Sequence, residues 1–423
     1  MGAIHILITV IRILLYIKEE NIMPVFIGNI HGIDTSTLET TIQNYTLGLS
    51  GKHPIYGVQY VIGRSDGVRE YTAQNMIWEP SSATYKGRDD FADLAPFNIK
   101  ECITVYNSST NGRDVVAYKG DSNWDEAVTK YKDDPNADMM MEFPKFYYKR
   151  PQRYEWLISP DPVDGFMPSP MHYRNGKMHD VVRISKYPLS GYRSWTGLSF
   201  STNTNWKTNN DNLRKKGQYE WDYAAWMSIV MLMMVKYNNM DLEACLGGFA
   251  NDTCGVNDGI QGLDGHVTTN TLMGIEFPLK WVHQGGVYHN NGDVFVNTNI
   301  ENITNWPADF GNPYTDGWEK VPTSCAVNSG TITQIAYDDS YPWCNFATAV
   351  GSNSNNPSTG NPYINDYWYY SSGSGYLITA SNNDAGNAGA FGANANNAVS
   401  YGNSNCASLS LLISLKKKYL GIG

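Results

Sequence analysis

The stretch YEWDYAAWMSIVMLMMVKY, residues 219–237, carries the one long helical pattern in the chain. Ala225, Ile229, Leu232 and Met233 recur at the spacing that places side chains on one face of a helix. The stretch also contains a run of methionines, Met227, Met231, Met233 and Met234. Because no His or Cys shares their face, we interpret these methionines as core packing and not as a cofactor-binding cluster.

Short β-prone runs precede this helix and are separated by turns rich in Gly, Asn, Asp and Ser. They include Tyr56–Ile62, Cys102–Tyr106 and Val115–Tyr118. Nearer the N-terminus, Ser36 and Glu39 stand at the spacing of a capping box, which predicts the start of a shorter helix. The chain is therefore expected to combine many strands with few helices.

Composition limits the classes of partner. The 423 residues include 31 Lys and Arg against 41 Asp and Glu, and no segment holds an excess of basic residues. A nucleic-acid-binding surface needs such an excess, so nucleic acid is not an expected partner. The chain has 29 Tyr and 12 Trp but only 17% charged residues. This balance suits an adhesive or lectin-like protein, since rigid aromatic side chains give contact area at a low entropic cost.

The cysteines and acidic residues do not predict a metal site. The six cysteines are scattered, without a CxxC pair or a His cluster, so no disulfide framework or zinc site is expected. Cys245 and Cys254 are close enough in sequence to pair, but buried free thiols are the preferred interpretation. Asp252, Asp258 and Asp264 could offer oxygens to calcium, but the EF-hand spacing is missing and an ordinary loop is favoured. We expect no metal and no cofactor.

Residues 1–22 are predicted to be an extension from an upstream start that does not belong to the natural protein. Ala3–Ile17 is apolar, but it is too short and interrupted for a transmembrane helix and lacks the layout of a signal peptide. Lys18-Glu19-Glu20 can be encoded as AAGGAGGAA, a purine-rich ribosome-binding sequence, just before Met23. Translation is therefore expected to begin at Met23.

The C-terminal part of the chain has a different composition. Between Lys320 and Lys416 there is no Lys or Arg, and Ile335–Leu415 also lacks Glu, Gln and Met. An Asn-, Ser- and Gly-rich segment is ordinarily loop-rich or disordered. Aromatic residues persist through it, however, and it ends in the apolar run Leu409–Leu415. Ordered loops closed by a core strand are therefore expected.

Four segments carry a resemblance to a known family. They are MEFPKFYYK at 141–149, VVRIS at 181–185, the helix at 219–237 with Leu246-Gly247-Gly248 after it, and GIEFP at 274–278 followed by Trp281 and Gly285-Gly286. Together they resemble the variable proteins of diversity-generating retroelements, which are found among phage tail-fibre and receptor-binding proteins. The GIEFP segment is also similar to the core motif of C-type-lectin folds of the formylglycine-generating-enzyme type.

The resemblance implies an α+β fold with a C-type-lectin-like domain of this subtype at 139–423. A smaller β-rich region at 23–138 would serve attachment or oligomerisation. The resemblance also implies a variable region, here 335–415, rewritten by adenine-directed mutagenesis mostly at AAY codons. Changing the first two bases of AAY never yields Lys, Glu, Gln, Met or Trp. The window lacks the first four residue types, so Trp343 and Trp368 would be fixed scaffold positions.

The candidate ligand-binding residues are Asn and Tyr side chains of this region. Tyr supplies stacking area and Asn supplies adaptable hydrogen bonds, as in antibody loops. The candidates are Asn345, Asn353, Asn355, Tyr363, Asn365, Tyr367, Tyr369, Tyr370, Asn382, Asn383, Asn387, Asn394, Asn396, Asn397, Tyr401 and Asn403. For each Tyr, the alternative is a half-buried strand position without a contact role.

These features predict a non-catalytic receptor-binding protein at the tip of a phage tail fibre, located on the virion tail. Its partners would be a host cell-surface protein or glycan and other tail components. The family resemblance implies a homo-oligomer, with a trimer expected. The first alternative is a bacterial or prophage-encoded surface adhesin that binds a glycan with the same fold.

An oxidase of the formylglycine-generating type is the second alternative. Such an enzyme needs a reactive cysteine pair, but Cys325, Cys344 and Cys406 have no basic or His neighbour in sequence to activate a thiolate. A glycan-cleaving enzyme would need two positioned carboxylates. Asp338-Asp339 and Asp366 are candidates, but turn-forming or solvated roles are expected for them.

Mass spectrometry of the protein purified from its natural source is expected to find an N-terminal peptide that begins at Met23. The reason is the ribosome-binding sequence that Lys18-Glu19-Glu20 can encode. Detection of any peptide from residues 1–22 would contradict this start site.

Overall fold

The computed structural model describes residues 53–80, 86–199, 201, 205–245, 271–276, 283–300, 317–351, 360–379, 389–397 and 408–413. All of them lie in one compact unit, Leu47–Gly423. The predicted extension 1–22 and the helix expected at Ser36 lie outside the described residues. Within these ranges, none of the helices has the length and apolar character needed to span a membrane.

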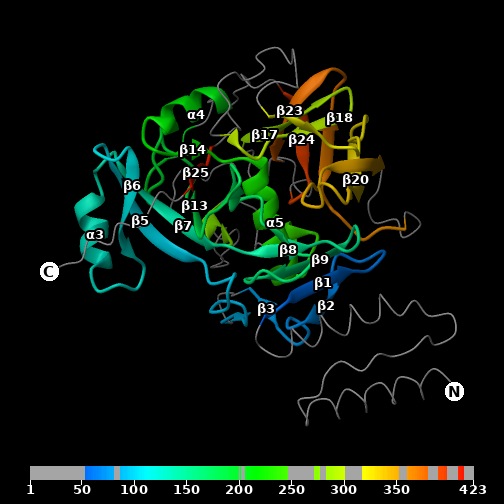
Figure 1. The fold of residues 1–423 in the computed structure, drawn as a ribbon, viewed down its shortest axis with the longest axis horizontal. Coiled ribbons are helices and arrows are strands. Elements are labelled where there is room, and N and C mark those ends of the chain that lie inside the picture. Colours follow the sequence, from blue (N-terminus) through cyan, green and yellow to red (C-terminus); the bar gives the residue numbers. More distant parts are fainter. Residues whose placement is uncertain are drawn as a thin grey trace, which may run out of the picture. The chain divides into compact units, whose positions relative to one another are not determined.

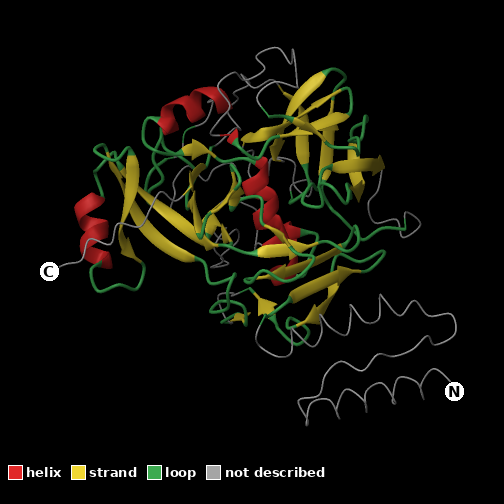
Figure 2. Ribbon diagram, viewed as in Figure 1, coloured by secondary structure: helices red, strands yellow, loops and turns green. Residues whose placement is uncertain are grey.

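The described chain is mostly β-structure, as Figures 1 and 2 show. Over these residues the helices are α3 (Trp124–Tyr131), α4 (Trp206–Arg214), α5 (Tyr223–Tyr237) and the short 3₁₀ helix η1 (Leu242–Cys245). The fold is therefore β-rich α+β, which confirms the predicted class at this level of detail.

Two of the larger sheets are antiparallel and contain strands from distant parts of the chain. The five-stranded sheet has the order β10 (Met167–Pro168), β8 (Tyr147–Lys149), β9 (Glu155–Ser159), β1 (Tyr56–Tyr60) and β2 (Gly67–Tyr71). The six-stranded sheet has the order β14 (Tyr219–Glu220), β25 (Ser410–Ile413), β13 (Val181–Ser185), β7 (Ala137–Pro144), β5 (Lys100–Asn107) and β6 (Gly112–Tyr118). The β-prone runs that begin at Tyr56, Cys102 and Val115 are thereby confirmed as strands.

The eight-stranded sheet contains most of the described C-terminal part. Its order is β19 (Glu319–Lys320), β18 (Asp293–Val296), β17 (His283–Asn290), β23 (Ser374–Thr379), β24 (Ala393–Asn397), β22 (Tyr367–Tyr370), β20 (Gly330–Ile335) and β21 (Ala347–Gly351). Of these neighbours, β22 and β24 run parallel and the others antiparallel. Three ribbons complete the strands: β3 (Trp78–Glu79) with β4 (Arg88–Asp89), β11 (Tyr173–Arg174) with β12 (Lys177–Met178), and β15 (Thr271–Leu272) with β16 (Ile275–Glu276).

The boundary expected near residue 138 does not separate two folding units. Strand β7 runs through it, β5 pairs with β7, and β1 pairs with β9. Residues on both sides therefore share sheets and a single core cluster. The reason is that one edge of β1 pairs with β9 and one edge of β5 pairs with β7. The strands before residue 138 therefore do not form a sheet of their own.

Helix α5 is buried on every side and lies between the large sheets (Figure 1). It packs against β1, β9 and β17. All its methionines lie in the core, which confirms their interpretation as packing residues. A helix that is apolar around its whole circumference is stable only in such surroundings. Asn238, in the left-handed conformation at φ 53°, ends it.

The helix begins four residues later than the sequence pattern predicted. Tyr219 and Glu220 form β14, and Asp222 caps α5 by accepting a hydrogen bond from the Ala225 backbone N–H at 2.8 Å. An Asp at this position satisfies an otherwise unpaired amide of the first turn. The apolar periodicity continues through the preceding strand, so it did not reveal this start.

The carboxylate of Asp222 also forms a buried ion pair. Both terminal guanidinium nitrogens of Arg174, Nη1 and Nη2, donate to it, and Nη2 lies 2.9 Å from Oδ1. Arg174 Nη1 donates to the carbonyl oxygen of Thr298 at 2.9 Å, and Nε donates to that of Met171 at 3.1 Å. The Asp222–Arg174 pair thus joins α5 to strand β11, and Arg174 also binds the loop after β18.

Close packing explains one glycine of the sequence motif at 285–286. A Cβ on Gly285 would lie 2.2 Å from the ring of Trp206, which is itself 2% exposed. Gly285 also bridges to Asp222 as an isolated parallel β-bridge. Only glycine lets this strand approach α4 so closely.

The C-terminal strand and the thiols agree with the sequence-based expectations. Strand β25 lies between β13 and β14, inside the six-stranded sheet, so a core strand does close the C-terminal part. Cys102, Cys245, Cys325 and Cys344 are free and buried. Cys254 and Cys406 lie outside the described residues.

Replacing Asp222 with Ala is expected to destabilise the protein by about 3–5 kcal/mol, because it leaves the Arg174 charge buried without its partner. Urea unfolding followed by tryptophan fluorescence measures this loss. Asp211→Ala is the control, since Asp211 forms only an exposed ion pair with Lys207 and should change stability by less than about 1 kcal/mol. Equal losses in the two variants would contradict the central role of Asp222.

Candidate ligand-binding surface

Strand β22 and the residues before it alternate between two environments. Ile364, Asp366 and Trp368 are fully buried, whereas Tyr363, Asn365, Tyr367 and Tyr369 are only half-buried. Successive side chains of an extended chain point to opposite sides, so one side is fixed in the core and the other faces outward.

The outward side carries Tyr363, Asn365, Tyr367 and Tyr369, which we call the tyrosine face. The rings of Tyr367 and Tyr369 lie 4.4 Å apart between centroids, at an interplanar angle of 46°. Tyr363 donates its hydroxyl hydrogen bond to Asn365 Oδ1 at 2.9 Å. The next residue, Tyr370, packs against the core instead, with its ring 5.1 Å from that of the buried His289 of β17. The ring contact and the hydrogen bond restrict the side chains of Tyr363, Tyr367 and Tyr369.

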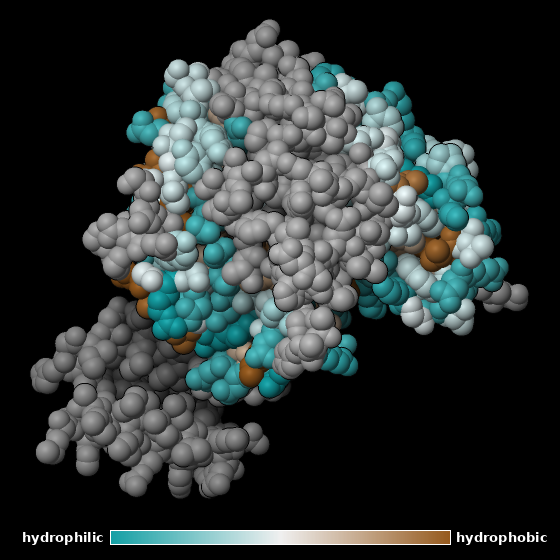
Figure 3. Space-filling view, turned by 180° about the vertical axis from the view of Figure 1, so that it is seen from behind, coloured by the Kyte–Doolittle hydropathy of each residue, from teal (hydrophilic) through white to brown (hydrophobic). Residues whose placement is uncertain are grey.

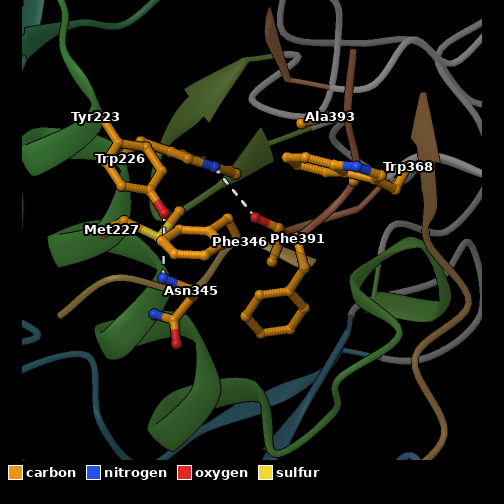
Figure 4. A pocket seen from close by; sticks show the side chains of 10 residues that line it. Tyr223, Trp226, Met227, Asn345, Phe346, Trp368, Phe391 and Ala393 are labelled. Atoms are coloured by element: carbon orange, nitrogen blue, oxygen red, sulfur yellow. Dashed lines mark hydrogen bonds between the residues drawn. The ribbon is translucent and has the colours of Figure 1, made fainter. Parts of the chain in front are cut away.

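The inward side of β22 packs against α5. Trp368 Nε1 donates to the carbonyl oxygen of Ala326 at 3.0 Å, and Trp226 Nε1 donates to that of Ala390 at 3.2 Å. The rings of Trp226, Trp368 and Phe391 surround a cavity of about 10 Å³, which Figure 4 shows from close by. A space of that size holds at most one water molecule, so it is part of the packing and not a ligand pocket.

Asp366 immediately precedes β22, and its carboxylate contacts the loop before β24. Its Oδ2 accepts hydrogen bonds from the backbone N–H groups of Phe391 at 2.7 Å and Gly392 at 3.0 Å. A Cβ on Gly389 would lie 1.9 Å from Asp366 Oδ1, so only glycine fits there. Burial raises the pKa of Asp366 to about 7, and the two N–H donors offset part of that rise.

The expectation that Asp366 lies in a turn or in solvent is therefore wrong. It is 0% exposed and shares the buried side of the strand with Ile364 and Trp368. The alternation of Ile364, Asp366 and Trp368 along the sequence could have revealed this position. Asp338 does have a turn role, as expected, because its Oδ1 accepts a hydrogen bond from the Ser340 backbone N–H at 2.9 Å.

Two of the predicted contact residues lie in the interior. Asn345 is 1% exposed, and its backbone N–H donates a hydrogen bond to the Tyr223 hydroxyl oxygen at 3.1 Å, as the close-up in Figure 4 shows. Asn394 is 7% exposed, because β24 is a central strand of the eight-stranded sheet. Neither side chain is presented to a ligand in this structure, which corrects the expectation for both.

The other candidates divide into three groups. Tyr363, Asn365, Tyr367 and Tyr369 lie on the tyrosine face, whereas Tyr370 is partly buried and packs against the core. Asn396 and Asn397 contribute backbone to β24, with Asn397 opposite Tyr376. Seven candidates lie outside the described residues: Asn353, Asn355, Asn382, Asn383, Asn387, Tyr401 and Asn403.

The described cysteines are poorly suited to thiolate chemistry. Burial raises the pKa of Cys325 to about 12 and that of Cys344 well above its ordinary value. Both thiols therefore stay protonated at neutral pH, whereas a reactive cysteine has a lowered pKa and partial exposure. Cys406, the third cysteine of this half, lies beyond the described ranges.

No family model matches this chain. No similar curated protein was found either. The inference of function therefore rests on the residues and their geometry.

Metal-binding geometry is not seen in the described residues. Within them, no group of three or more His, Cys, Asp or Glu side chains is placed to hold a metal ion. The possible calcium-binding residues Asp252, Asp258 and Asp264 lie outside them.

The described surface is mostly hydrophilic. On the side shown in Figure 3, apolar residues appear as small, separate areas. The exposed large apolar side chains of the described chain are Val61, Ile62, Val68, Leu94, Met167, Tyr173 and Val327. Val61 and Ile62 are adjacent in sequence, and Met167 and Tyr173 line the same pocket, whereas isolated exposed residues such as Leu94 and Val327 need no partner.

Asp366→Asn is expected to flatten the pH dependence of stability. The pKa of Asp366 rises from 3.8 to about 7 on folding, so the folded protein holds this proton more tightly than the unfolded chain does. The free energy of unfolding should therefore fall as the pH rises from about 4 to about 7, then level off. The Asn variant lacks the titrating group and should lose this component.

Urea unfolding at a series of pH values measures this effect. Asp339→Asn is the control, because Asp339 is exposed and the variant should keep the dependence of the wild type. If the Asp366→Asn protein retained the same fall between pH 4 and 7, the assignment to Asp366 would be wrong.

Proposed function

We propose that this protein is a receptor-binding protein that displays a variable ligand-binding surface on a C-type-lectin-like scaffold, at the tip of a phage tail fibre. The single observation that carries the proposal is the alternation along β22. Its outward side bears clustered tyrosines, while its inward side is fixed by Asp366, Trp368 and their hydrogen bonds.

This division lets recognition change without loss of the fold. Substitutions of outward side chains usually alter stability little, whereas the loss of a buried aromatic side chain leaves a cavity. Tyr367 and Tyr369 contribute rigid aromatic area with few rotamers to restrict. Asn365 provides a donor and an acceptor beside them. Together these residues suit contact with a protein patch or a sugar ring.

The composition of the window 335–415 supports the same proposal. It lacks Lys, Glu, Gln and Met, which changes in the first two bases of AAY codons cannot produce. Its two tryptophans, also unreachable from such codons, are both buried, Trp343 at 6% and Trp368 at 0% exposure. A buried tryptophan is what a fixed scaffold position requires. Several copies on one virion would add avidity to weak individual contacts.

The experiment that tests this function is sequencing of the natural locus, with its flanking DNA, across a population. We expect a near-copy of codons 335–415 beside a reverse transcriptase gene, with differences only at adenines of that copy. We also expect genes for virion tail components nearby. A locus without such a copy, and with an invariant segment, would refute the variable-surface proposal.

Variants of β22 are expected to separate binding from folding. Replacing Tyr367 and Tyr369 together with Ser should weaken adsorption to host cells at least tenfold, because aromatic anchors commonly carry about 2 kcal/mol or more of binding energy. The same variant should lose no more than about 1 kcal/mol of stability per site.

Trp368→Ala is the matched buried variant and should lose about 3–5 kcal/mol of stability. Cell-binding assays and urea unfolding give the two measurements. Unchanged adsorption by the tyrosine variant would show that the tyrosine face is not the contact surface.

A further inference from the structure

A second candidate binding site lies away from β22. It is a pocket of about 300 Å³ between β10, β11, the loop after β18, β19 and the segment 340–343. That volume is at the small end of the range of about 300–1,000 Å³ seen for small-molecule pockets. The pocket is thus large enough for one or two sugar rings.

Aromatic side chains line this pocket at different depths. Trp343 is only 6% exposed and stands next to Tyr223 of α5, with ring centroids 5.6 Å apart. Tyr341 is half-buried, and Tyr173 is 45% exposed at the opening. The electron-rich faces of such rings attract the C–H groups on the apolar face of a pyranose.

Oriented polar groups accompany these rings. The Tyr341 hydroxyl donates to Glu319 Oε2 at 2.9 Å. Burial, and secondarily this hydrogen bond, raises the pKa of Tyr341 to about 12, so the phenol remains a donor at neutral pH. Glu319 is exposed and carries a second carboxylate oxygen, an acceptor suited to a sugar hydroxyl.

A pair of asparagines forms another part of the wall. Asn297 Oδ1 accepts a hydrogen bond from the Asn299 backbone N–H at 2.8 Å, and Asn299 Oδ1 accepts one from that of Asn175 at 2.6 Å. These contacts hold the amide side chains in place before a ligand arrives. Fixed polar groups beside apolar walls give a pocket its orientation and specificity.

The charge of the pocket narrows the ligand class. None of its described lining residues is Lys, Arg or His, and Glu319 is the one charged side chain among them. Such a lining offers nothing to neutralise a phosphate, a sulfate or a sugar carboxylate. A neutral polyol with one apolar face matches it better.

We propose that this pocket is a binding site for a neutral saccharide, one or two pyranose rings in size. Trp343 and Tyr341 pack against the sugar rings, Tyr173 covers the opening, and Glu319 and Asn299 bind hydroxyl groups. Most of the lining precedes residue 335, outside the window that would vary. Of the named contacts, Tyr173, Asn299 and Glu319 lie outside that window, and Tyr341 and Trp343 lie inside it. The site does not depend on what the tyrosine face recognises.

Isothermal titration of the full-length protein with methyl glycosides of neutral hexoses and N-acetylhexosamines tests the site. At least one of them is expected to bind at millimolar or lower concentration. Tyr173→Ala, at an exposed position, should weaken that binding about tenfold or more, as the loss of a stacking partner would. Tyr341→Phe should weaken it by removing the hydrogen bond that orients Glu319.

Tyr367→Ala, on the tyrosine face, is the control and should bind the saccharide as the wild type does. The proposal is overturned if no glycoside of the panel binds. It is also overturned if the Tyr173→Ala variant binds the glycoside as tightly as the wild type does. Preferential binding of the cation choline, or of an anionic sialylated sugar, over every neutral glycoside would overturn it as well. Loss of saccharide binding in Tyr367→Ala alone would assign the sugar to the tyrosine face instead.

Discussion

The carboxylate of Asp222 accepts hydrogen bonds from Arg174, which lies 48 residues earlier in the chain, and from the first turn of α5. Both partners are fully buried, so each charge is tolerated only because the other is present. This contact fixes where α5 begins and which way it points. The strands β1, β9 and β17 then pack against the helix, and the inward face of β22 meets it through Trp226 and Trp368. The position of the outward tyrosines is in this sense a consequence of a buried ion pair.

The two candidate sites use the scaffold in different ways. The tyrosine face lies on a single strand whose alternate residues are held in the core, so its chemistry can change one side chain at a time. The saccharide pocket combines five separate segments, and its residues are tied to each other by hydrogen bonds. A change at one of those positions would disturb several others. A surface of the first kind suits varied recognition, and a pocket of the second kind suits a constant ligand.

Local patterns in the sequence predicted the local structure well. The strands at the β-prone runs that begin at Tyr56, Cys102 and Val115, the buried helix and the closing strand at Ser410 all follow from periodicity and composition. The start of α5 was misplaced because apolar spacing runs through Tyr219 and Glu220, where pairing with β25 decides the structure. Asn345 and Asn394 were assigned to the surface by residue type, but their exposure depends on which strands neighbour them. The pocket could not be predicted at all, since its lining is assembled by sheet topology.

Three residues behind the tyrosine face, Trp368, Gly389 and Phe391, differ from the tyrosines in their codons. If mutagenesis changes only adenines, a residue cannot be replaced when its codon has no adenine at a base that determines the amino acid. Every glycine codon begins GG and tolerates any third base, tryptophan is TGG, and phenylalanine codons begin TT. Trp368, on the inward side of β22, and Gly389 and Phe391, which lie next to Asp366, therefore cannot be altered at an adenine, whereas the codons of tyrosine, asparagine and aspartate always present one. Beneath the tyrosine face, these parts of the core would be shielded by their nucleotide sequence as well as by their burial.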